Sequence, residues 1–140
     1  MVAKRQQTGT RGVFLVAAEL TAQGFIAVPT SRNAFGADLL VTDQGCLRAF
    51  SVQVKTNAGR SSFWLLNKHS KRLKSPSHIY VLVNLCEGRD LPKPEYYVVP
   101  SKVVAKSMCV QRRPGSTWCS FDRSYAAKYK DKWGVFRVRN

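Results

Sequence analysis

Hydrophobic and polar side chains alternate most clearly between residues 36 and 55, where the pattern predicts two β-strands joined by a turn. The apolar run 39–41 is followed by Asp43-Gln44-Gly45, a sequence typical of hairpin turns. A second run, 48–55, then alternates residue by residue. This stretch is therefore expected to form a β-hairpin.

The second strand of this hairpin has one apolar and one polar face, because side chains in a strand alternate sides. The apolar face carries Phe50, Val52 and Val54, and the polar face carries Ser51, Gln53 and Lys55. Asp38, one strand earlier, can lie across from the polar face. A carboxylate, an amide oxygen and an ammonium group would then meet at one place.

The remaining pattern predicts further elements on both sides of the hairpin. Apolar residues at helical spacing indicate a helix over 13–23, ended by Gly24. Strands are expected at 25–29, 78–85 and 95–100. A helix over 102–108 with Ser101 as its N-cap, a basic loop over 111–116 and a second basic helix within 121–132 follow. The alternating tail 135–140 suits an edge strand or a docked extension.

This order of elements predicts one α/β (α+β) domain over residues 1–140, with a central mixed β-sheet flanked by helices. Residues 1–11 are polar and basic, and residues 8–12 are too rich in glycine to favour a helix, so we expect a flexible basic arm. Its Lys4, Arg5 and Arg11 either contact phosphate or are simply solvated.

The net charge of the chain indicates which class of molecule it binds. The chain has 23 Lys and Arg against 8 Asp and Glu, a net charge of +15 over 140 residues. A polyanion is the natural partner of such a chain, and nucleic acid fits better than a membrane. No apolar run approaches the roughly 18 residues that span a bilayer, and the first residues do not resemble a signal peptide. The four cysteines show neither a C-x-x-C pair nor zinc-site spacing, which favours reduced thiols in the cytoplasm.

Two basic segments are candidates for contact with phosphate. The loop between the first two strands offers Ser31, Arg32 and Asn33. A longer basic segment offers Lys68, Lys71, Arg72 and Lys74, although a solvated basic face would look the same. Phe63 and Trp64 precede this segment and could stack on bases, but packing in the core is the better interpretation for large aromatic residues.

The polar face of the hairpin suits hydrolysis of a phosphodiester bond. This reaction needs neutralisation of the phosphate charge and an activated water, which a divalent metal on oxygen ligands supplies. Asp38 and the side-chain oxygen of Gln53 are the candidate ligands of Mg²⁺ or Mn²⁺, and Lys55 is the candidate base or transition-state residue. Glu19, the one charged residue between Gly12 and Ser31, either supports this site or sits at an exposed edge of its helix.

Taken together, Glu19, Gly36-Ala37-Asp38 and Gln53-Val54-Lys55 resemble the PD-(D/E)XK nuclease superfamily, which includes restriction endonucleases and archaeal-type Holliday junction resolvases. The resemblance covers about residues 12–100. It implies a restriction endonuclease-like fold, metal binding by Asp38 and Gln53 with support from Glu19, catalysis by Lys55, and DNA as the substrate. It also allows a homodimer, because related nucleases often pair to place two sites on two strands.

Gln53 departs from the pattern of most members, which have Asp or Glu there. In this respect the chain is similar to Mrr-type restriction endonucleases, which have Gln-x-Lys. Because Gln53 removes one negative charge, a nucleic-acid-binding module without catalysis is the main alternative to a nuclease. A third hypothesis is a basic scaffold protein that uses Tyr96 and Tyr97 or the C-terminal tail as its contact surface.

Overall fold

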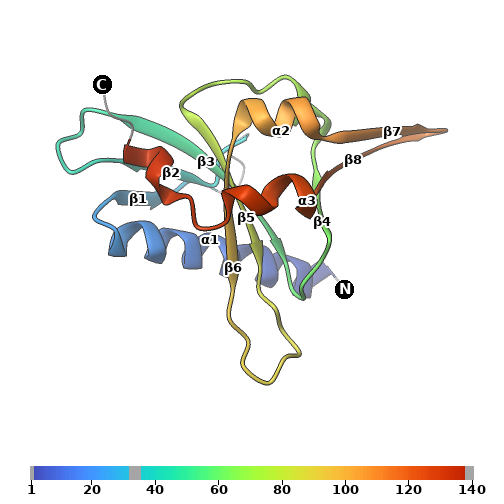
Figure 1. The fold of residues 1–140 in the computed structure, drawn as a ribbon, viewed down its shortest axis with the longest axis horizontal. Helices are drawn as coiled ribbons and strands as arrows, with labels where there is room; N and C mark the ends of the chain where they lie inside the picture. The colour runs from blue at the N-terminus through green and yellow to red at the C-terminus, as the bar shows by residue number, and fades with distance from the viewer. Residues whose placement is uncertain (1, 32–35, 138–140) are drawn as a thin grey trace.

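The structure is a computed structural model that describes residues 2–31 and 36–137. Its strands are β1 (Ile26–Pro29), β2 (Leu39–Thr42), β3 (Ala49–Asn57), β4 (Phe63–Leu66), β5 (His78–Asn84), β6 (Glu95–Pro100), β7 (Cys109–Arg113) and β8 (Ser116–Asp122). Its helices are α1 (Val2–Ala22), α2 (Ser101–Ser107) and α3 (Arg123–Ala126), with 3₁₀ turns η1 (Lys68–Lys71), η2 (Ala127–Tyr129) and η3 (Trp133–Arg137) (Figure 1). None of the described helices is long and apolar enough to cross a membrane.

A mixed five-stranded sheet in the order β1-β2-β3-β5-β6 forms the centre of the fold. The pair β3–β5 is parallel, and the other neighbours are antiparallel. All seven residues of β5 are buried, as expected for an apolar strand in the middle of a sheet. The predicted fold class, a central mixed sheet flanked by helices, is confirmed.

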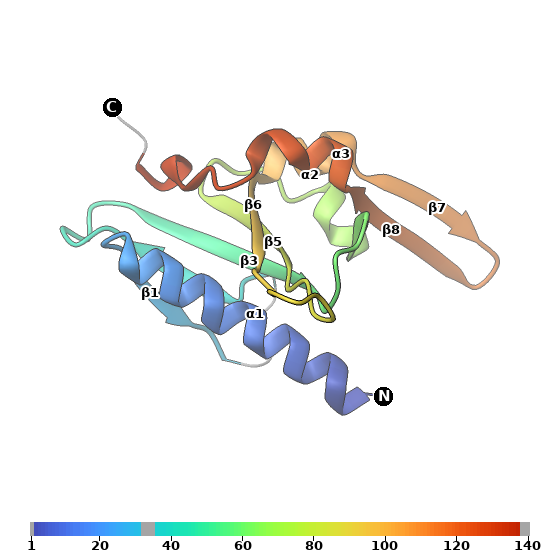
Figure 2. The same ribbon diagram turned by 60° about the horizontal axis from the view of Figure 1, so that its bottom comes forward.

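Each face of this sheet is covered by a different layer (Figure 2). Helix α1 packs on one face, where Val16 and Leu20 meet Val52 and Val54 of β3 in a first hydrophobic core. The other face carries α2, α3 and a second sheet of order β4-β8-β7, packed around Trp64 in a second core. The alternation along β3 therefore decides which layer each of its side chains meets.

The predicted β2–β3 hairpin is present, with a longer connection than a tight turn. Asp43 Oδ1 accepts hydrogen bonds from the backbone N–H groups of Leu47 and Arg48, at 2.8 and 3.2 Å, which closes a loop over residues 43–48. Gly24, predicted to end the first helix, follows α1 with a φ of +94°, the left-handed conformation that glycine adopts at helix ends.

The expected flexible arm over residues 1–11 is wrong, because residues 2–11, the part of it that the structure describes, form the first half of α1. An ion pair between Arg11 and Glu87, with 3.0 Å between Nη1 and Oε1, ties this half to the loop after β5. Gly12 lies so close to β3 that an added Cβ would overlap the side chain of Thr56. Gly12 lowers the helix propensity of this segment but permits the close approach that holds the helix.

The C-terminal part also differs from the prediction. The expected loop over 111–116 is a β-hairpin of β7 and β8, and β8 also pairs with the distant β4. The expected helix within 121–132 is reduced to α3 and η2. Ser101 begins α2 without capping it, since its hydroxyl donates to the Ser75 carbonyl at 2.7 Å. The tail docks, with Trp133 and Phe136 buried in the first core; residues 138–140 lie outside the described part.

Two glycines of α1 provide a matched test of this packing. Gly12→Ala should destabilise the protein by about 1–3 kcal/mol, because its Cβ overlaps Thr56. Gly9→Ala should stabilise it by about 1 kcal/mol, because an added Cβ at Gly9 meets nothing within 4 Å and alanine favours helix. Urea denaturation of both variants measures these changes, and effects of the same sign would contradict the close approach of α1 to β3.

Candidate active site

Asp38 lies at the start of β2 and is held by both main chain and side chain. Its backbone N–H donates to the Val52 carbonyl at 2.8 Å, and its own carbonyl accepts from Thr30 N–H at 3.0 Å. Its carboxylate Oδ2 accepts a hydrogen bond of 2.8 Å from the backbone N–H of Val54. This bond fixes the carboxylate at the residue between Gln53 and Lys55.

Gln53 and Lys55 lie on the face of β3 away from α1, as the alternation predicts. Their neighbours on β5 are Tyr80 and Leu82, both fully buried in the second core. The side chains of Gln53 and Lys55 are half-buried. The structure thus brings together three of the predicted site residues, Asp38, Gln53 and Lys55.

Burial changes the acid-base properties of Lys55. Loss of solvent lowers the pKa of its ammonium group, and the nearby negative charge of Asp38 offsets part of this effect. A lysine in this state releases a proton more readily than an exposed one. Lys55 can therefore hold or transfer a proton near a reacting phosphate.

The N-terminal half of α1, for which the sequence predicts a flexible arm, adds residues to the site. Lys4, Arg5 and Thr8 line one cleft of about 530 Å³ with Lys55 and Leu65, which we call the Lys55 cleft. Helical periodicity could have placed Lys4, Arg5 and Thr8 on one side of a helix, but Gly9 and Gly12 obscured the helix itself. Lys4 and Arg5 are thus positively charged residues of the same cleft as Lys55.

Glu19 does not join the site. Its carboxylate accepts a hydrogen bond from Gln23 Nε2 at 3.1 Å, and it lines a cleft with Tyr96, Arg89 and Lys93. Tyr96 packs against the first core, so Glu19 lies with α1 on the opposite face of the sheet from Lys55. The prediction of a helix over residues 13–22 is confirmed. Because this helix covers the face of the sheet opposite Lys55, Glu19 is separated from Asp38.

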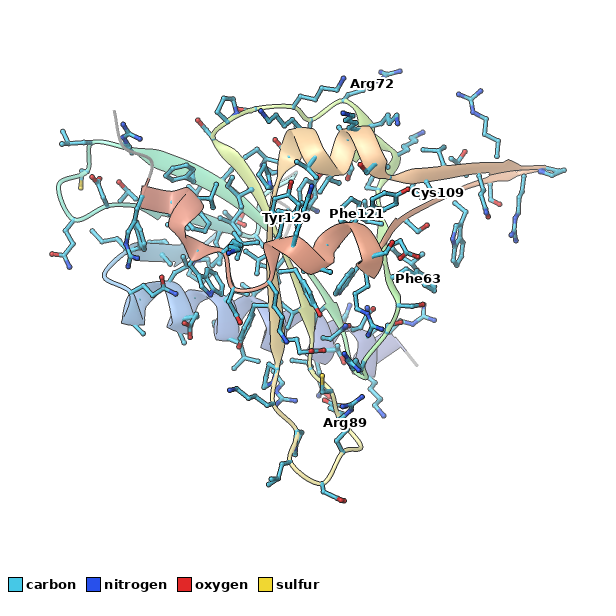
Figure 3. The ribbon with its side chains drawn as sticks, in the orientation of Figure 1. Phe63, Arg72, Arg89, Cys109, Phe121 and Tyr129 are labelled. Atoms are coloured by element: carbon cyan, nitrogen blue, oxygen red, sulfur yellow. The ribbon has the colours of Figure 1, made fainter. Side chains whose placement is uncertain are left out.

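The predicted phosphate-binding residues fall into separate places. Ser31 is exposed, whereas Arg32 and Asn33 lie outside the described residues. A second cleft, of about 830 Å³, is lined by Lys68, His69, Lys71 and Arg72 beside Val110, Arg112, Thr117 and Cys119 of the β7–β8 hairpin. Arg72 projects from the surface beside α2 (Figure 3). Lys74 is exposed just beyond Leu73, which lies within contact distance of Gly36.

Few of the described side chains could bind a metal ion at this site. Among the described residues, no three His, Cys, Asp or Glu side chains gather as metal ligands. Asp38 provides a carboxylate bound to the backbone N–H of Val54, and Gln53, the residue before Val54, carries an amide oxygen. Mg²⁺ accepts oxygen ligands, often one or two carboxylates with water and substrate phosphate, so this pair fits a weakly held hard cation.

Comparison with solved structures finds nucleases. A Holliday junction resolvase, Hjc, from the archaeon Archaeoglobus fulgidus superposes with a TM-score of 0.51 and 16% sequence identity, covering 86% of this chain and 88% of that one. The bacterial homing endonuclease I-Ssp6803I gives a TM-score of 0.54 and 14% identity, covering 94% and 91%. The fold is that of these nucleases. No protein-family model and no curated protein matches the chain.

This likeness supports the predicted restriction endonuclease-like fold. The identities are too low to carry over a residue's role, so they do not test the Gln53-x-Lys55 motif. The chemistry of the site depends on Asp38, Gln53 and Lys55 themselves.

The lowered pKa of Lys55 predicts how its removal changes stability. Below the folded-state pKa, the buried charge destabilises the native state, and this penalty disappears as pH rises towards 10.5, the unfolded value. Lys55→Met should therefore raise the midpoint of thermal unfolding at pH 7, by an amount that shrinks at alkaline pH. Asp38 keeps its hydrogen bond from Val54.

Lys102→Met, at an exposed position of α2, is the control for the change of side chain. Differential scanning calorimetry between pH 7 and 10.5 measures both variants. A lower midpoint for Lys55→Met at pH 7 would show that attraction to Asp38 outweighs burial.

Proposed function

We propose that this protein is a metal-dependent nuclease that hydrolyses DNA phosphodiester bonds at Asp38, Gln53 and Lys55. The observation that carries the proposal is the hydrogen bond from Val54 N–H to Asp38 Oδ2, which holds a carboxylate beside Gln53 and Lys55. The nuclease fold and the net charge of +15 support it independently.

Each residue has a distinct role in this proposal. Asp38 and Gln53 hold Mg²⁺ or Mn²⁺ through their side-chain oxygens. The bound metal supplies neutralisation of the phosphate and an activated water. Lys55, with its lowered pKa, orients the water or takes its proton, and its charged form stabilises the phosphorane-like transition state.

Substrate binding is assigned to the basic residues around this centre. Lys4 and Arg5 line the Lys55 cleft and bind the phosphates next to the scissile one. Ser31, Arg32 and Asn33, which come before Asp38 in the sequence, and Lys68, Lys71, Arg72 and Lys74 bind DNA beyond it. The homodimer stays a prediction.

A second candidate function is a DNA-binding module of the same fold without catalysis. The position of Glu19 on the other face of the sheet favours it, because the site then has one carboxylate and a neutral amide. Weak metal binding would follow from so little negative charge. The scaffold hypothesis loses support, since Tyr97 is buried and Tyr96 packs on Trp133 with 5.6 Å between ring centroids.

Cleavage assays test the nuclease directly. Asp38→Asn and Lys55→Met should each lower the rate on plasmid, single-stranded or branched DNA in Mn²⁺ by at least about 100-fold. Glu19→Gln, which removes the carboxylate on the other face, should leave the rate unchanged. No cleavage of any substrate by the unmodified protein would reject the proposal in favour of the binding module. Cleavage that survives both site variants would reject Asp38 and Lys55 as the catalytic residues.

Because residue 53 is an amide, we expect a carboxylate at this position to increase the affinity for a metal ion. Gln53→Glu should bind Mn²⁺ roughly tenfold more tightly or better, because ligand charge sets the affinity for hard cations. Isothermal titration calorimetry of the DNA-free protein measures this, with Gln44→Glu in the exposed β2–β3 loop as the control for net charge. Equal effects of the two substitutions would show that residue 53 does not contact the ion.

A further inference from the structure

The β7–β8 hairpin projects from the body of the protein (Figures 1 and 2). Its two faces carry different side chains. Cross-strand partners are Val110 with Cys119 and Arg112 with Thr117, so these four side chains share one face. Arg113 follows Arg112 along β7 and belongs to the other face. Only the first face takes part in the cleft against η1.

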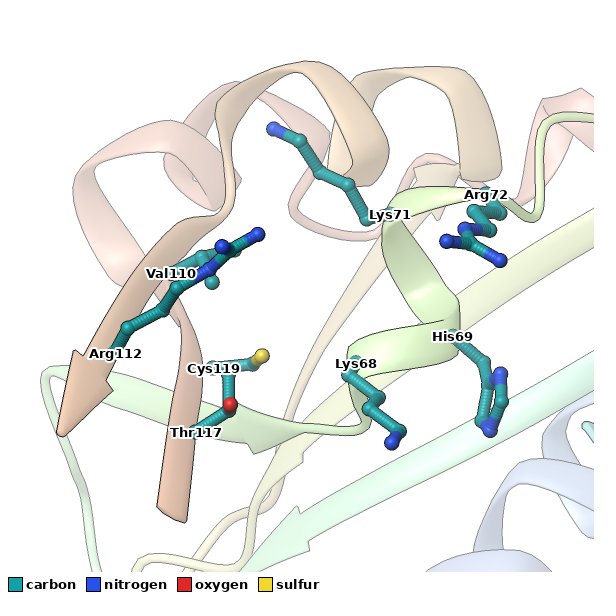
Figure 4. Close-up of a pocket in the computed structure, with 8 residues that line it drawn as sticks. All are labelled: Lys68, His69, Lys71, Arg72, Val110, Arg112, Thr117 and Cys119. Carbon is teal, nitrogen blue, oxygen red and sulfur yellow. The ribbon is translucent and has the colours of Figure 1, made fainter. Parts of the chain in front are cut away.

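The cleft between η1 and the hairpin is strongly cationic. Lys68, Lys71 and Arg72 form its η1 side, and Arg112 extends into the same space from the hairpin (Figure 4). No Asp or Glu is among the described residues that line it. Ion pairs between described residues use Arg11, Arg60 and Lys130, which lie elsewhere. Several like charges around one hollow, with no acid among them, favour binding of an extended anion.

The position of η1 connects this cleft with the candidate active site. Ser70, the buried residue of η1, lies close enough to Tyr80, the cross-strand neighbour of Gln53, to oppose the rise in the pKa of Tyr80 that burial causes. Leu73, just after η1, lies next to Gly36, two residues before Asp38. The cleft thus lies on the outer side of the segment that borders Asp38 and Gln53.

We propose that the cleft between η1 and the β7–β8 hairpin binds the sugar-phosphate backbone of one DNA strand, with Arg112 as the contact from the hairpin. This proposal rests on the proposed function for the identity of the anion. A two-stranded ribbon is narrow enough to enter the major groove of a duplex, so the hairpin can follow the strand whose backbone the cleft holds. Thr117 adds a hydroxyl that can donate to a phosphate oxygen.

Arg112 and Arg113 provide a matched pair for the test. Both substitutions to alanine remove one positive charge from adjacent positions of one strand, but only Arg112 lines the cleft. Binding of a fluorescent DNA duplex and of the same single strand is measured by anisotropy in EDTA, where no metal-dependent cleavage occurs. Arg112→Ala should weaken binding roughly tenfold and lower the salt slope by about 1. Arg113→Ala should have a clearly smaller effect on both.

A second pair of substitutions tests whether weaker binding could come from a changed structure of the hairpin. Thr117→Glu brings a negative charge into the cleft, whereas Ser116→Glu brings it to the adjacent position on the other face. Thr117→Glu should weaken binding more than Ser116→Glu, at unchanged thermal stability. Equal effects within both pairs would show that only overall charge matters, and would overturn the proposal.

Two further outcomes separate this proposal from others. If AMP or inorganic phosphate competes with the labelled DNA at concentrations close to those of unlabelled oligonucleotide phosphate, the cleft is a small-anion site and the proposal fails. Because binding is measured without metal, loss of the nuclease hypothesis leaves these results intact. Cleavage that depends on Asp38, with equal effects of Arg112→Ala and Arg113→Ala on binding, would overturn the cleft alone.

Discussion

The hydrogen bond from Val54 N–H to Asp38 Oδ2 is the interaction on which the candidate site depends. A backbone N–H in a sheet must find an acceptor, and here a side chain takes that place where β2 has not yet begun. The carboxylate is consequently fixed to β3 itself, so its position relative to Gln53 and Lys55 follows from strand geometry rather than from a loop. Any chemistry at this site relies on that rigidity.

Strand β3 holds the site rigidly, although the buried charge of Lys55 on this strand destabilises the folded state. One face of β3 contributes Val52 and Val54 to the first core, while the other carries Gln53 and Lys55 towards the second layer. Burial lowers the pKa of Lys55 and so disfavours its charged form in the folded state. The cores stabilise the strand on which this unfavourable charge is held, a balance that functional sites often show.

Two clefts near the site are lined by positively charged residues, and different parts of the chain form them. Lys4 and Arg5 reach Lys55 because α1 extends to the N-terminal side of Gly12, which lets the helix approach Thr56. Lys68, Lys71 and Arg72 meet Arg112 because β8 pairs with β4 and carries the hairpin next to η1. Of the 23 Lys and Arg residues of the chain, seven line these two clefts.

The sequence by itself determined the β2–β3 hairpin, the two faces of β3 and the position of Asp38 against the strand that carries Gln53 and Lys55, because alternation and short turns are local properties. It also determined the central mixed sheet. Only the tertiary structure decided that Glu19 faces away from Asp38, since helical spacing does not say which face of a sheet a helix covers. The helical arm and the β7–β8 hairpin were likewise decided by contacts distant in the chain. Gly12 with Thr56, and β4 with β8, override local signals that indicated loops.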